Sequence, residues 1–165
     1  MADHESIRKL AEALVSELTS SGKMVSTAES CTGGWIAKAI TDIPGSSAVF
    51  AYGIVSYSNG AKESLLGVHN QTFVDHGAVS APAVKEMAEG VINLSGADIA
   101  VAVSGIAGPD GGTQEKPVGT VWFAWAVRDG AKVTSKANSK QFDGDRELIR
   151  ELTVAHALQG IRERL

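Results

Sequence analysis

The 165-residue chain has a single cysteine, no basic run and no long apolar run. One cysteine, Cys31, cannot form an internal disulfide, and a zinc site would need further Cys or His ligands in a recognisable spacing. Lys and Arg number 15 against 19 Asp and Glu, and this net charge of -4 is unlike that of proteins that bind nucleic acid nonspecifically. No stretch approaches the ~18 uninterrupted apolar residues of a membrane span, and residues 1–10 contain no apolar signal core. We therefore expect a soluble, cytoplasmic protein with no metal, membrane partner or nucleic-acid partner.

Several catalytic signatures are also missing. Neither the P-loop nor the dinucleotide-binding glycine pattern occurs, and Gly-x-Ser-x-Gly is absent. A Ser-His-Asp triad has little support, because His69 and His76 lie in a predicted loop and His4 lies close to the chain start. His156 falls on the predicted last helix, where a packing role is the simplest interpretation.

Glycine, in contrast, is abundant. The chain has 18 glycines, roughly 11% of the residues against a usual ~7%. They concentrate after predicted strands, at Gly33 and Gly34, at Gly45, and in the loop from Gly105 to Gly119. Tight turns alone would explain any one of them. Because ligands of open α/β sheets bind beyond the carboxyl ends of strands, the clustering favours an anion or nucleotide site.

Apolar periodicity and turn residues predict one α/β domain over residues 1–165, a layered α/β/α arrangement with a mixed β-sheet. A strong hairpin signal at Asp129 and Gly130 joins the last two strands, and Trp122 and Trp125 should point to opposite faces of the first of these. The predicted helices cover residues 4–21, 35–40, 60–66, 81–94 and from 143 onward, and the predicted strands cover 23–28, 48–57, 97–103, 118–128 and 132–142.

Two cations lie in the first turn of predicted helices, where the helix dipole disfavours positive charge. Lys62 follows a cap at Ser58 or Asn59, and Arg146 follows a predicted cap at Asp143. Both could simply be exposed and solvated. A partly buried Lys would have a lowered pKa and could act as a neutral general base. Arg146 cannot lose its proton and suits a phosphate or carboxylate.

A basic lysine needs a nucleophile, and the residues in turns offer several. The candidates are Ser30, Cys31, Ser46, Ser47 and Ser104. Ser–Lys pairs are a known variant of the serine-hydrolase arrangement. Cys31 is the weaker candidate, because a lone cysteine is most often a small buried residue.

Several short motifs together resemble the CinA C-terminal domain family across nearly the whole chain. They are TAESCTGG at 27–34, PGSS at 44–47, YSN at 57–59 with Lys62, GAVS at 77–80, SGIAGP at 104–109 and KPVGT at 116–120. The resemblance implies a stand-alone amidohydrolase that converts the carboxamide of nicotinamide mononucleotide to nicotinate mononucleotide and ammonia in pyridine nucleotide salvage. It also implies a Ser/Lys mechanism without metal or cofactor.

Carried onto this sequence, the resemblance implies Ser47 as nucleophile and Lys62 as its base, with Ser30 as the competing nucleophile and Tyr57 as a further catalytic residue. Backbone N–H groups at Gly33 and Gly34, or at Gly45 and Ser46, could stabilise the oxyanion. The implied substrate-binding residues are Thr32, Gly33, Gly34, Gly45, Ser46, Ser104, Gly105 and Arg146.

Other functions remain open at this point. The same loops could serve a noncatalytic pyridine-nucleotide-binding module, or a hydrolase that acts through Cys31. The family name alone suggests an assembly protein in competence or DNA-damage responses. We also expect a homo-oligomer, in the simplest case a homodimer, since Trp122 and Trp125 would suit a dimer interface if their strand lies at a sheet edge.

Overall fold

Helices and strands alternate along the chain much as the sequence predicts. The computed structural model describes residues 3–165. The helices are α1 (His4–Ser21), α2 (Trp35–Thr41), α3 (Asn59–Leu66), α4 (Asn70–His76), α5 (Ala81–Ser95) and α6 (Arg146–Arg162), with a 3-10 turn η1 (Ser46–Ala48). The strands are β1 (Val25–Glu29), β2 (Phe50–Val55), β3 (Ile99–Gly105), β4 (Thr120–Asp129) and β5 (Lys132–Gln141).

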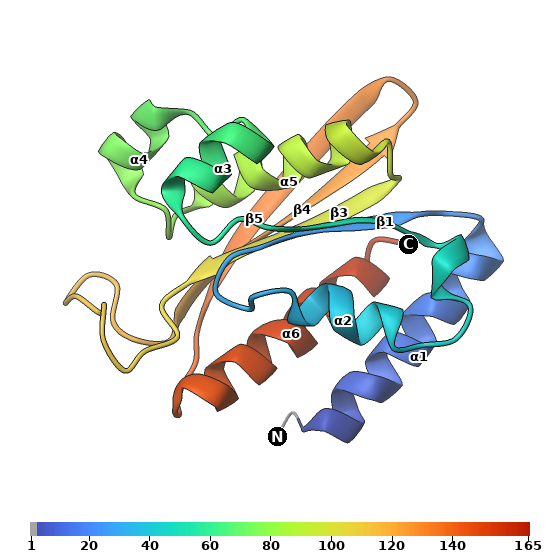
Figure 1. Ribbon diagram of the computed structural model, residues 1–165, viewed down its shortest axis with the longest axis horizontal. Helices are drawn as coiled ribbons and strands as arrows, with labels where there is room; N and C mark the ends of the chain where they lie inside the picture. The colour runs from blue at the N-terminus through green and yellow to red at the C-terminus, as the bar shows by residue number, and fades with distance from the viewer. Residues whose placement is uncertain (1–2) are drawn as a thin grey trace.

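The five strands form one mixed sheet in the order β2-β1-β3-β4-β5. Strands β2 and β3 both run parallel to β1, whereas β4 is antiparallel to β3 and β5 is antiparallel to β4. Helices α3, α4 and α5 cover one face of the sheet, and α1, α2 and α6 cover the other (Figure 1). The predicted single-domain α/β/α fold with a mixed sheet is confirmed.

Side chains on β3 and β4 alternate between two apolar cores, as period-two strands require. Ile99, Val101, Val103, Phe123 and Trp125 pack with α1, α2 and α6. On the opposite face the same strands bury four alanines, at positions 100, 102, 124 and 126, against α5, and Trp122 packs beside them. Small side chains on this face allow α5 to lie close to the sheet.

Both tryptophans of β4 fall where the alternation predicts, and the expectation of an edge strand is wrong. Trp125 packs in the core beneath α6, and Trp122 packs against the core beneath α5. Strand β4 lies between β3 and β5, so neither ring is at an edge of the sheet.

Polar caps fix where most helices begin. Asp3, Ser58 and Ser80 each accept a hydrogen bond from a backbone N–H of the first turn. The predicted start of the last helix at Asp143 is wrong, because Asp145 accepts from Leu148 N–H and makes Arg146 the first helical residue. Helix α4 falls in a region predicted as loop; it has no side-chain cap and buries no residue, so its sequence carries little helical signal.

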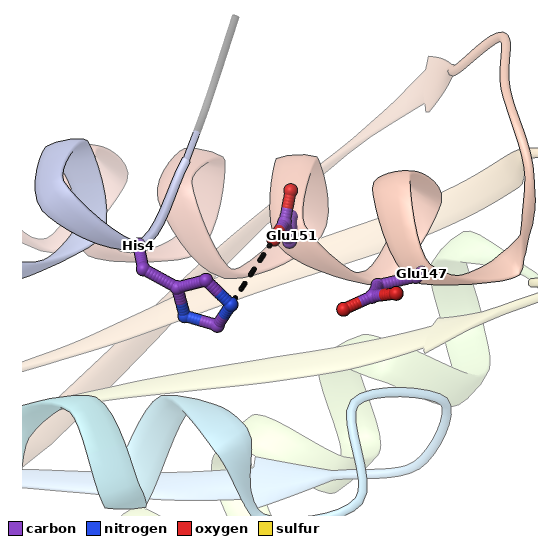
Figure 2. Close-up of side chains that lie close together, drawn as sticks. All are labelled: His4, Glu147 and Glu151. Atoms are coloured by element: carbon purple, nitrogen blue, oxygen red, sulfur yellow. Dashed lines mark ion pairs between the residues drawn. The ribbon is translucent and has the colours of Figure 1, made fainter.

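Helices α1 and α6 meet on the outer layer, where three possible metal-ligand side chains gather. Figure 2 shows His4 of α1 beside Glu147 and Glu151 of α6, and the His4 Nε2–Glu151 Oε1 distance is 3.5 Å. Their ligand atoms lie within 4.8 Å of one another, which no other trio of His, Cys, Asp or Glu achieves in residues 3–165. None of the three lines the cavity described below. No helix in that range is both long and apolar enough to cross a membrane.

Candidate active site

The parallel strands β1, β2 and β3 have their carboxyl ends along one edge of the sheet, perpendicular to the strands. Residues at these ends surround a cavity of about 300 Å³. Ser30 follows β1, Tyr57 follows β2, and Ser104 lies near the end of β3. Arg146 reaches the same cavity because β5 also ends at this edge and α6 begins directly afterwards. This is where α/β sheets generally bind ligands.

Lys62 of α3 and Ser30 form a buried pair in this cavity. Lys62 Nζ donates to Ser30 Oγ at 3.0 Å and to the carbonyl oxygens of Ser56 and Tyr57 at 2.9 and 3.1 Å. Only 1% of Lys62 and 8% of Ser30 is exposed. The distance suits proton transfer between a hydroxyl nucleophile and a basic amine.

The environment of Lys62 favours its neutral form. Burial lowers the pKa of Lys62, because the ammonium loses hydration and no carboxylate in the described chain forms an ion pair with it. The three oxygens around Nζ are neutral acceptors. A neutral amine that faces a serine hydroxyl is able to act as a general base.

Cys31 lines the same cavity, but its chemistry differs. Burial raises the pKa of the Cys31 thiol to about 12, so the thiolate is scarce near neutral pH. The thiol is therefore poorly suited to nucleophilic attack. The structure favours the interpretation of Cys31 as a buried packing residue.

Arg146 joins two walls of the cavity. Its Nη1 donates to the Gly108 carbonyl at 2.7 Å, and its Nη2 donates to the Tyr57 hydroxyl at 3.1 Å. A guanidinium has five N–H donors, so others remain for an anionic ligand. Arg146 is thus a fixed positive charge at the rim of the Ser30–Lys62 pair.

The fold agrees with the comparison with known proteins. The family model for the CinA C-terminal domain matches residues 7–165. The chain belongs to the CinA C-terminal domain family.

Relatives with curated names cover the CinA domain almost completely. The chain is 53% identical over 159 residues to the nicotinamide-nucleotide amidohydrolase PncC of Escherichia coli strain K12, covering 96% of this chain and 94% of that protein. It is 54% identical to the protein of the same name from Pseudomonas putida, covering 94% of each. The crystal structure of competence/damage inducible protein CihA from Agrobacterium tumefaciens superimposes with a TM-score of 0.90 at 47% identity, covering 96% of this chain and 94% of that one.

Within this CinA domain, the predicted contact between Ser47 and Lys62 is absent. Ser47 lies in η1, which precedes β2, and the nearby Val49 carbonyl accepts from Val25 N–H at the start of β1. Ser30 follows the end of β1, five residues farther along the strand, or roughly 16 Å away at ~3.3 Å per residue. Ser47 is therefore exposed at the opposite edge of the sheet from Lys62.

The predicted glycine turns also separate. Gly45 and Ser46 lie with Ser47 at that opposite edge, where Ser46 Oγ donates to the Thr41 carbonyl. Gly33 and Gly34 border a second cleft of about 760 Å³, behind the loop that carries Ser30. Neither turn lines the cavity of Lys62, whereas Ser104 and Gly105 do.

Thr32 borders the same second cleft, and its side chain is already engaged. Its hydroxyl is fully buried and donates to Glu29 Oε1 at 2.6 Å. That geometry gives Thr32 a partner within the protein rather than a free hydroxyl for substrate.

Some cavity residues had escaped the sequence analysis. Ala78 and Val79 form part of the wall, and so do Asn59 and Asp110. The GAVS and SGIAGP motifs include or adjoin most of them, so their membership in short motifs was the available signal. Glu29 was also missed; a charged residue at the end of an otherwise uncharged strand was the clue.

Proposed function

We propose that the chain is a nicotinamide-nucleotide amidohydrolase that hydrolyses the carboxamide of nicotinamide mononucleotide, in the cytoplasm, as a step of pyridine nucleotide salvage. The observation that carries the proposal is the buried Lys62–Ser30 pair in a cavity that also contains Arg146. Relatives that bear the amidohydrolase name match the chain over nearly its full length.

In the proposed mechanism, Ser30 is the nucleophile and neutral Lys62 is the base. Lys62 Nζ takes the hydroxyl proton as Ser30 Oγ attacks the carboxamide carbon. The resulting ammonium then donates a proton to the leaving nitrogen, so ammonia departs and an acyl-enzyme remains. Water attacks this ester with Lys62 again as base, releasing the carboxylate product and restoring Ser30.

Backbone and cationic groups complete the proposed site. The N–H of Cys31 directly follows the nucleophile and makes no hydrogen bond to another residue within 3–165, which leaves it available to a developing oxyanion. Arg146 and the loop from Gly105 to Gly111 supply charge and donors for the substrate phosphate. An anionic substrate is thus held by local positive charge in a chain whose net charge is -4.

The test is ammonia release from nicotinamide mononucleotide by the purified protein and two serine variants. Ser30→Ala should abolish turnover. Ser47→Ala makes the same substitution at an exposed serine on the opposite edge of the sheet, and it should retain turnover. Loss of activity in Ser47→Ala with retention in Ser30→Ala would overturn the assignment. Tight binding of the nucleotide without any ammonia would instead favour a noncatalytic binding module.

We also propose that the chain forms a homodimer through the free edge of β2. No charged residue occurs between Asp42 and Lys62, and Tyr52 and Val55 of β2 are 46% and 47% exposed. The other edge strand, β5, has lysines at 132, 136 and 140, which protect an edge against pairing. A two-fold pairing of identical strands is self-complementary.

The dimer proposal predicts a change in mass with one substitution. Val55→Lys should yield monomers in sedimentation analysis, because it places two positive charges in the paired edge. Lys136→Glu on β5 is the control and should leave the mass unchanged. A wild-type monomer, or a Val55→Lys variant that remains dimeric, would contradict the β2 interface.

A further inference from the structure

The loop that carries Ser30 is closed by the carboxylate of the residue before it. Glu29 Oε1 accepts from Thr32 Oγ1 at 2.6 Å and from Ile36 N–H at 2.8 Å, and Oε2 accepts from Ala37 N–H at 3.0 Å. These bonds join the end of β1, the middle of the loop and the first turn of α2. The Glu29 side chain thereby links the two ends of the loop of residues 30–34 by hydrogen bonds.

Glu29 also replaces a missing helix cap. The N-cap residue of α2 is Gly34, which has no side chain, whereas an N-cap side chain usually accepts from the second or third helical N–H. Ile36 and Ala37 are those positions in α2, and Glu29 reaches them from the neighbouring strand. The orientation of α2 is therefore tied to the residue directly before Ser30.

This carboxylate occupies a costly position. Glu29 is fully buried, and burial raises the pKa of its carboxyl group while the hydrogen bonds from Thr32 and α2 oppose that change. A buried acid is retained in a protein interior only with such partners. An apolar side chain at the end of β1 would cost less free energy to bury. We therefore infer that the carboxylate is there to position the loop.

The backbone on the other side of Ser30 is fixed by the sheet. Ser30 N–H donates to the Val103 carbonyl at 3.1 Å, and the Glu29 carbonyl accepts from Ser56 N–H at 2.9 Å. Arg150 braces the loop from behind by donating to the carbonyls of Cys31 and Thr32. The sheet thus holds one end of the loop and Arg150 holds two of its carbonyls, while the Glu29 carboxylate ties the loop to the first turn of α2.

We propose that Glu29, acting through its bonds to Thr32 and to α2, is a positioning residue that holds Ser30 Oγ within reach of Lys62. The inference rests on the proposed function of the Ser30–Lys62 pair. Glu29 does not line the cavity, so it touches neither the substrate nor the reacting atoms. Its removal should therefore affect the chemical step more than substrate binding.

The decisive variants are Thr32→Val and Thr32→Ser, because they change one bond to Glu29 and keep the carboxylate. Thr32→Val removes the hydroxyl at nearly constant volume, and kcat for ammonia release should fall about 100-fold with little change in KM, as expected for a nucleophile displaced by ~1 Å. Thr32→Ser keeps the hydroxyl and should restore kcat. Thr153→Val, which also removes a fully buried hydroxyl, is the control and should keep wild-type kinetics.

Amide hydrogen exchange provides a readout that does not depend on turnover. In Glu29→Gln one of the two carboxylate oxygens becomes an NH₂ group that cannot accept a hydrogen bond, so at least one of the N–H groups of Ile36 and Ala37 should exchange faster while those of β3 stay protected. Unchanged exchange at both amides would overturn the proposal. Equal kcat in Thr32→Val and Thr32→Ser, or a rise in KM that accounts for the whole loss, would do so as well. A folded wild-type protein that releases no ammonia would contradict the proposed function, and amide exchange would then decide whether Glu29 holds the loop.

Discussion

Replacement of Lys62 by methionine tests how the protein holds a basic amine in its interior. Methionine has a similar length and no charge, and it removes the three hydrogen bonds of Nζ with Ser30 Oγ and with the carbonyl oxygens of Ser56 and Tyr57. A neutral amine has two N–H groups and one lone pair, so in that state it donates to the two carbonyls and accepts from the Ser30 hydroxyl. Each such hydrogen bond contributes roughly 0.5–1.5 kcal/mol net. At alkaline pH, where wild-type Lys62 is neutral, the free energy of unfolding of the variant should therefore be about 1.5–4.5 kcal/mol lower than that of the wild type.

The difference between the two proteins should depend on pH in a defined direction. Burial lowers the pKa of Lys62 in the folded state, whereas the unfolded chain keeps the ordinary value near ~10.4. Between these two values the unfolded state binds more protons, so the stability of the wild type rises with pH by up to ~1.4 kcal/mol per unit. This contribution is present above the unfolded value and is lost as pH falls through the folded value. Lys62→Met lacks it.

Urea unfolding of both proteins from about pH 7 to about pH 10 measures this difference, because most other titrating groups are shared. The advantage of the wild type should be largest at the alkaline end and should shrink toward neutral pH. Parallel stability curves would refute the reasoning, since they would mean that Lys62 has the same pKa folded and unfolded. The variant should release no ammonia at any pH. In the wild type, kcat/KM should rise with pH through the lowered pKa of Lys62.

Three shorter predictions concern the walls of the site and the core. Arg146→Lys should raise KM for the nucleotide by about 10-fold with a smaller change in kcat, because it loses the forked geometry that holds Gly108 and Tyr57; equal KM values would argue against a phosphate contact. Gly90→Ala should lower the Tm markedly, because an added Cβ would lie 2.0 Å from the Leu66 carbonyl oxygen; Gly60→Ala is the control, because its added Cβ would make only an ordinary contact of 3.9 Å with Ser58 Oγ. Iodoacetamide at neutral pH should leave activity intact, because the Cys31 thiol has a pKa of about 12, and rapid inactivation would revive the thiol mechanism.

Much of the fold follows from the sequence because its signals are local. The continuous apolar run at 97–103 became β3, covered on both faces, and Asp129 with Gly130 became the β4–β5 turn. Local signals also placed Lys62 and Arg146 in first helical turns. Helix α4 was missed because its residues are exposed, so no apolar periodicity marks it.

The choice between Ser30 and Ser47 could not be made from local sequence. Both serines lie in polar turns next to strands, and Ser30 follows β1 while Ser47 precedes β2. If β2 ran antiparallel to β1, both would lie at the same edge. The parallel pairing of β1 with β2 is a tertiary property, and it places them at opposite edges. Strand direction is therefore what selects the partner of Lys62.

The loop of residues 30–34 has a consequence for inhibitor chemistry, because it separates two hollows. Ser30 and Cys31 face the cavity of about 300 Å³, while Thr32, Gly33 and Gly34 border the cleft of about 760 Å³ beside Trp35 and Arg150. A compound in the larger cleft would press on the reverse side of the peptide groups that carry Ser30 without meeting the nucleotide. Inhibition from that side would lower kcat, so the rate would fall at every substrate concentration and added substrate would not relieve the inhibition.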